Sequence, residues 1–144
     1  MITNVSLVTL YVTDQDEAKK FYCDVLGFVE GTDVTLGDGF RWCTVHQPDH
    51  PELEVTLMKP GPPLDEDMAE AVRRALANGS MGGFGIATDD CRAEHRRLAE
   101  LGVFFVQEPA DRPYGVEAVF RDSSGNWLVM IEERPYSGTD FPHA

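Results

Sequence analysis

The hydrophobic pattern of the chain alternates between strand-like and helix-like segments from the start. Val5–Val12 is rich in apolar and β-branched residues, which is typical of a strand. Behind Asp14, a favoured N-cap residue, apolar positions recur at helical spacing as far as Leu26. Gly27 follows where a helix commonly ends. The pattern therefore predicts a strand, a helix, and a second strand that begins at Phe28.

The same pattern returns 75 residues further along the chain. The segment from Thr88 to Val103 repeats five residue types of the segment from Thr13 to Phe28, with strand-like stretches before and after both copies. The coincident pairs are Thr13/Thr88, Asp14/Asp89, Ala18/Ala93, Leu26/Leu101 and Gly27/Gly102. Such an internal repeat predicts a fold built from two similar modules.

Alternating and β-rich segments complete each module. In the first half they predict strands at Phe28–Leu36, Phe40–His46 and Leu53–Met58, with a hairpin at Gly37-Asp38-Gly39. In the second half they predict a helix at Asp90–Leu101, strands at Met81–Ile86, Val103–Gln107, Tyr114–Phe120 and Trp127–Glu132, and a loop at Glu108–Pro113. Each half therefore has the order β-α-β-β-β, and the fold class is α+β.

The length of 144 residues suits one domain made of two halves. We expect the modules at residues 4–60 and 80–133, separated by a linker and an amphipathic helix at residues 61–79 that bridges the halves. Residues 134–144 contain two prolines and a glycine, which predicts an irregular tail. Its Tyr136 and Phe141 are candidates for packing on the body or on a partner subunit.

The net charge of the chain limits the classes of partner that it can bind. A net charge of −13 opposes binding to nucleic acid, which requires a basic surface, and to anionic membranes. No apolar run has the length of a membrane span, and no signal peptide is recognisable. Cys23, Cys43 and Cys91 form no paired motif and are typical of reduced thiols, so we expect a cytoplasmic protein.

Two stretches of sequence resemble the vicinal oxygen chelate superfamily, which includes glyoxalase I, bleomycin-resistance proteins and extradiol dioxygenases. They are V-T-D-x-x-x-A-x-x-F-Y-x-x-x-L-G-F at Val12–Phe28 and F-R-D-S-S-G-N at Phe120–Asn126. Gln107-Glu108-Pro109 and Tyr114-Gly115 add to the likeness. The resemblance implies two βαβββ modules whose sheets curl around a shared cavity, and it makes a homodimer the expected assembly.

The resemblance also implies where a metal ion would be held in metal-dependent members, on the first and fourth strand of each module. These positions are Leu7 and Glu54 in the first module, and Gly82 or Gly83 and Val129 in the second. A divalent ion needs imidazole, thiolate or carboxylate ligands, and only Glu54 supplies one. We therefore predict that the chain holds no metal and no other cofactor.

The leading interpretation is a metal-free protein that binds a small, mostly apolar organic molecule in the cavity. The candidate ligand-binding residues are Leu7, Thr9, Arg41, Trp42, Glu54, Thr56, Gly83, Tyr114 and Val129. We expect Glu54 to line the cavity and to pair with a basic group, for which Arg41 on the neighbouring strand is the nearest candidate and Arg121 another. We expect Leu53, Val55 and Leu57 to pack under the helices.

Two other functions remain open at this stage. One is a lyase, isomerase or dioxygenase with a non-standard or displaced metal site, for which Glu54 is a weak candidate general base. The other is an association module whose pocket is vestigial. The sequence names neither the ligand nor the reaction.

Overall fold

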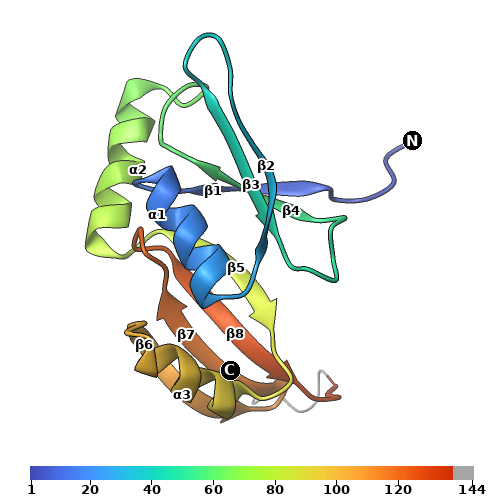
Figure 1. Cartoon of the computed structure of the whole chain (residues 1–144). Helices are drawn as coiled ribbons and strands as arrows, with labels where there is room; N and C mark the ends of the chain where they lie inside the picture. Colours follow the sequence, from blue (N-terminus) through green and yellow to red (C-terminus); the bar gives the residue numbers. More distant parts are fainter. Residues whose placement is uncertain (138–144) are drawn as a thin grey trace. The chain divides into compact units, whose positions relative to one another are not determined.

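The computed structural model describes residues 1–137 and divides them into two units (Figure 1). The first unit comprises Met1–Met81 together with Ser123–Asn126, and the second comprises Gly82–Asp122 together with the chain from Trp127 onward. None of the helices in the described part is long and apolar enough to cross a membrane.

The first unit is a four-stranded sheet with helices. Its elements are β1 (Leu7–Tyr11), α1 (Gln15–Lys20), the π-helical turn η1 (Phe21–Val25), β2 (Val29–Thr35), β3 (Arg41–His46), β4 (Glu54–Met58) and α2 (Glu66–Asn78). The strand order is β1-β4-β3-β2, with β1 parallel to β4 and the other pairs antiparallel. The predicted β-α-β-β-β order of the first half is therefore confirmed.

One face of this sheet packs against α1 and η1. The Asp14 side chain caps α1 by accepting a hydrogen bond from the backbone N–H of Glu17. Ala18 and Tyr22 are fully buried, as is Val45 on β3. Fully burying an apolar side chain of the size of valine or larger stabilises the fold by roughly 2–3 kcal/mol relative to leaving it exposed. The apolar stripe read from the sequence is thus the face that holds the helix to the sheet.

The second unit repeats the topology. Its elements are β5 (Gly82–Ala87), α3 (Cys91–Glu100), β6 (Phe105–Arg112), β7 (Gly115–Arg121) and β8 (Trp127–Glu133). The strand order is β5-β8-β7-β6, and β5 runs parallel to β8. The α+β class and the two-module architecture are confirmed.

The two module helices differ by one residue, which the sequence comparison missed. The N-caps are Asp14 and Asp90, not Asp14 and Asp89, while Gly27 and Gly102 both terminate their helices at positive φ (80° and 89°). The first helical segment therefore spans 27 − 14 = 13 steps and the second 102 − 90 = 12. A π-helical turn accommodates one extra residue within a helix, which is what η1 does.

Two other sequence expectations are corrected. Strand β6 continues through the predicted loop at Glu108–Pro113, because register shifts beside Gln107 accommodate Pro109 within the ladder. Leu53 precedes β4 and is 42% exposed, so it does not pack under a helix as Val55 and Leu57 do.

The helix between the modules belongs to the first unit. Asp65 caps α2, whose buried residues are Ala69, Val72 and Leu76. Met68, which the helical spacing also assigns to the apolar side, is 52% exposed. In the tail, Tyr136 is 57% exposed and its ring contacts the ring of Tyr114. Phe141, the other tail residue singled out, lies outside the described residues.

Candidate functional site

The open face of the first sheet is the side opposite α1. Leu7 pairs with Glu54, and Thr9 pairs with Thr56, along the parallel β1–β4 ladder. Because partners in register point the same way, these four predicted residues lie on one face. Leu7 is 44% exposed, whereas Thr56 is buried. Their role in ligand binding stays a prediction, but the strand register that groups them is present.

Thr56 has a buried hydroxyl without a partner. Its Oγ1 makes no hydrogen bond with any residue from 1 to 137. A buried hydroxyl left unpaired costs about 1–3 kcal/mol. A ligand group that hydrogen-bonds with Thr56 would remove that cost.

Glu54 reaches a notch in β2 at Gly31. The β2–β3 register shifts between Glu30 and Asp33, and a Cβ at Gly31 would lie 2.7 Å from Glu54 Oε2 and 2.5 Å from Thr44 Oγ1. A side chain at Gly31 would therefore displace the Glu54 carboxylate or the Thr44 hydroxyl, and the Glu54 carboxylate lies against the β2 backbone. Thr44 is the register partner of Thr56 and was not among the predicted residues, although strand alternation from Trp42 indicates it.

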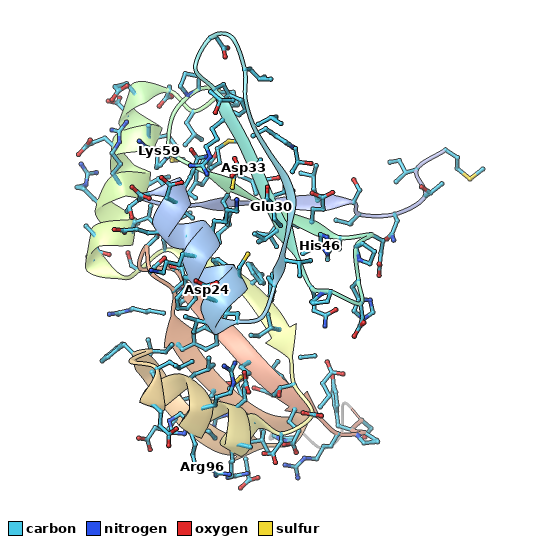
Figure 2. All side chains as sticks on the ribbon, viewed as in Figure 1. Asp24, Glu30, Asp33, His46, Lys59 and Arg96 are labelled. Atoms are coloured by element: carbon cyan, nitrogen blue, oxygen red, sulfur yellow. The ribbon has the colours of Figure 1, made fainter. Side chains whose placement is uncertain are left out.

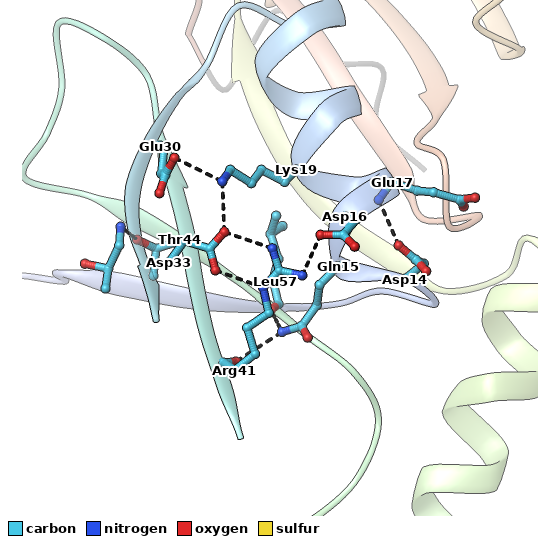
Figure 3. A network of polar contacts seen from close by, with 11 residues as sticks. Asp14, Gln15, Asp16, Glu17, Lys19, Glu30, Asp33, Arg41, Thr44 and Leu57 are labelled. Carbon is cyan, nitrogen blue, oxygen red and sulfur yellow. Dashed lines mark hydrogen bonds and ion pairs between the residues drawn. The ribbon is translucent and has the colours of Figure 1, made fainter. Parts of the chain in front are cut away.

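Arg41 does not pair with Glu54, and that expectation is wrong. Arg41 donates from Nε and Nη2 to the two carboxylate oxygens of Asp33, each at 2.8 Å, and from Nη1 to Asp16 at 2.7 Å (Figure 3). Asp16 belongs to α1, so Arg41 lies on the helix-covered face. Because successive strand residues alternate, Arg41 and Trp42 cannot both face the same side.

The helix-covered face carries a network of ion pairs around Asp33. Lys19 contacts Asp33 at 2.8 Å and Glu30 at 3.0 Å (Figure 3). Hydrogen bonds donated by Arg41, which has the largest effect, and by Lys19 hold the pKa of the Asp33 carboxyl well below its usual range. The same contacts raise the pKa of Lys19 and of Arg41. The Asp33 side chain is only 16% exposed. Its ion pairs join α1 to β2 and β3.

Trp42 is half-buried on the open side, the register partner of Val34 and a ring neighbour of Phe40, whose centroid is 6.3 Å away. Val34 and Phe40 are exposed. These aromatic and apolar side chains therefore lie on or next to the same sheet as the three polar residues Thr44, Thr56 and Glu54.

On the second sheet, the residue beside Val129 is Gly85. The β5–β8 register shifts between Gly82 and Gly85, so neither Gly82 nor Gly83 has Val129 as its partner. The expected equivalence of Gly83 with Leu7 is therefore wrong, because a bulge in β5 displaces the register. Val119 on β7 is the other register partner of Val129, and both are half-buried.

Tyr114 belongs to a polar cluster at one end of this sheet. Its hydroxyl donates a hydrogen bond to Glu117, and that bond is the largest cause of a raised Tyr114 pKa. Arg112 Nε lies 3.7 Å from Glu117 and its Nη2 donates to Gln107 Oε1 at 3.3 Å. Glu117 and Gln107 were not among the site residues predicted from the sequence. Glu117 lies on the open face, where it is the register partner of Ile131.

The four positions implied for a metal offer one carboxylate, at Glu54. Among residues 1–137, no group of three or more His, Cys, Asp or Glu side chains lies together in an arrangement that could hold a metal ion. His46 ends β3 (Figure 2), His50 contacts Glu52, and the His95 ring packs edge-on against Phe105. His143 lies outside the described residues.

The thiols do not have the chemistry of nucleophiles. Cys43 and Cys91 are fully buried, and burial raises the pKa of both. Burial also raises the pKa of the half-buried Cys23. A raised pKa lowers the fraction of reactive thiolate at neutral pH.

The two βαβββ modules define the class of protein by its fold, and comparison with known proteins supports that class. The family model of the glyoxalase/bleomycin resistance protein/dioxygenase superfamily matches residues 4–130. The chain belongs to this superfamily.

Individual relatives share most of their length with the chain. YurT, an uncharacterized protein of Bacillus subtilis (strain 168), is 31% identical over 131 residues, which is 90% of this chain and 98% of YurT. The crystal structure of UcmS2 is similar with a TM-score of 0.84 and 45% identity, covering 92% of this chain and all of UcmS2. TnmS3, an antibiotic binding protein from Streptomyces sp. CB03234, has a TM-score of 0.73 and 29% identity, covering 92% of this chain and 98% of TnmS3.

Proposed function

We propose that the chain is a metal-free member of its superfamily that binds and sequesters a small, mostly apolar organic molecule. The observation that carries the proposal is the open face of the first sheet. It carries both the exposed side chain of Leu7 and the buried hydroxyl of Thr56, which has no hydrogen-bond partner among residues 1–137. Ligand sites typically combine apolar walls with a few polar groups. This face has that composition.

Similarity to a known binding protein supports the proposal. TnmS3 is described as an antibiotic binding protein, and this chain resembles it over almost the full length of both. A sequestering protein needs affinity and no reacting group, which fits buried thiols of raised pKa and a single carboxylate at the four expected metal positions. We extend the proposal to a homodimer, motivated by exposed apolar residues at Ile2, Val5 and Val8 near the edge strand β1.

The proposal is tested by thermal unfolding of the full chain with a panel of apolar antibiotics and polycyclic aromatic compounds. A compound that binds only the native state raises the midpoint, as mass action requires. The variant Leu7→Glu places a charge on the open face and should abolish the shift. The control Met68→Glu adds the same charge at a residue 52% exposed on α2 and should retain it. Equal shifts in both variants, or none in the wild type, would contradict the proposal.

A further inference from the structure

Arg121 is a half-buried cation on the second sheet that has no ionic partner within the described residues. The other half-buried cations of the described chain, Lys19, Arg41 and Arg112, each contact a carboxylate, whereas Arg121 contacts none among residues 1–137. Its Nε is buried and makes no hydrogen bond there. The chain has 25 acidic and 12 basic residues, so a missing counter-ion is not explained by a shortage of carboxylates.

Aromatic side chains lie on both sides of Arg121. The guanidinium carbon is 5.3 Å from the centre of the Phe104 ring, a cation–π distance that orients the planar group. Trp127 is the register partner of Arg121, and its indole occupies the space over Gly82, where an added Cβ would lie 2.6 Å from Cζ2. Phe104 is 62% exposed and Trp127 is 39% exposed, so both present ring surface to solvent.

An apolar floor adjoins the arginine. Val119 and Val129 are register partners on the same face as Arg121 and Trp127, because they lie two residues away along β7 and β8. Gly85, the other partner of Val129, adds no side chain. The floor of this face is therefore made of two small apolar side chains and a glycine.

The acidic residue closest along this face has its own partners. Glu117 lies four residues from Arg121 on β7, roughly 13 Å along an extended strand. Its carboxylate is bonded to Tyr114 and lies beside Arg112. Glu117 therefore does not serve as the counter-ion of Arg121.

We propose that the open face of the second sheet binds an aromatic organic anion, with the oxyanion on Arg121 and the ring over Val119 and Val129 beside Trp127. The planar guanidinium matches a carboxylate by paired hydrogen bonds, and a buried N–H gains most from such a partner. This inference rests on the proposed function, that the chain binds small organic molecules, and adds a second site, on the second sheet, with its own ligand class.

The test compares 2-naphthoate with its uncharged methyl ester by titration calorimetry on the full chain. We expect the acid to bind the wild type at least about tenfold more tightly than the ester, the advantage of a charge-assisted contact. Arg121→Gln should remove that advantage and leave ester binding unchanged. Arg96→Gln, at an exposed arginine on α3 (Figure 2), is the matched control and should behave as wild type.

Two outcomes would overturn the inference while the proposed function stands: equal affinity for acid and ester, or the same loss in Arg121→Gln and Arg96→Gln. If neither probe binds while neutral compounds of the thermal panel do, the inference also fails alone. If nothing in either assay binds, both proposals fail. Should Arg121→Gln not fold, methyl NMR shifts in the wild type decide the matter. The acid should move the Val119 and Val129 signals, and a shift confined to other residues would refute the site.

Discussion

At the scale of single residues, two buried polar atoms on open sheet faces make no hydrogen bond with any part of the chain that the structure describes. They are Thr56 Oγ1 in the first unit and Arg121 Nε in the second. Native structures leave few such atoms unsatisfied, so each one calls for an explanation. On our proposals, an organic ligand on each of the two faces would supply the missing hydrogen-bonding group there.

Replacing Thr56 by valine tests this explanation because the two side chains have the same shape. Thr56→Val removes an unpaired hydroxyl from a buried site, so the free energy of unfolding should stay equal or rise by about 1 kcal/mol. Affinity for the best ligand of the thermal panel should fall at least severalfold. Thr35→Val, at an exposed threonine on β2, is the control for both measurements. A stability loss above about 1 kcal/mol with unchanged affinity would show that the hydroxyl serves the fold.

At the scale of elements, the Asp33 network is the clearest electrostatic tie in the first unit. Asp33 on β2 contacts Arg41 on β3 and Lys19 on α1, so one carboxylate joins three elements. The pKa of Asp33 is lowered in the folded state. A lowered carboxyl pKa contributes stability above the unfolded pKa of about 4, and that stability is lost as the pH falls below it.

Asp33→Asn should therefore lower the free energy of unfolding at pH 7, by roughly 1–3 kcal/mol, because two cations lose a charged acceptor. The difference from wild type should shrink as the pH falls below about 4, because the unfolded chain then takes up a proton at Asp33 that the folded protein does not. Urea denaturation across this pH range measures both effects. Asp24→Asn, at an exposed position (Figure 2), should change neither. A constant difference at every pH would mean that the charge of Asp33 is not the stabilising feature.

Most elements of the fold could be predicted from the sequence because their causes are local. Helix caps at Asp14 and Asp65, and helix ends at Gly27 and Gly102, follow from side-chain and backbone chemistry within a few residues. Strand alternation likewise placed Thr56 on the same side as Glu54.

The features that were missed depend on pairing between distant strands. The bulge in β5 moved the partner of Val129 from Gly83 to Gly85, and nothing local signals a bulge among several glycines. The face of Arg41 was also misjudged, because adjacency of strands was considered without alternation along β3. The cluster of Tyr114 with Glu117 requires the β7 register, which only the assembled sheet supplies.

At the scale of the whole molecule, our central proposal is that this chain of 16.0 kDa binds a small organic molecule without a metal ion. Native mass spectrometry of the purified protein with its best ligand tests this most directly, since it reports ligand, metal and subunit number in one spectrum. We expect the mass of a dimer with bound ligand and no metal, unchanged after treatment with EDTA. About one Zn, Ni, Fe or Mn per chain, or ligand binding that EDTA abolishes and added metal restores, would contradict the account.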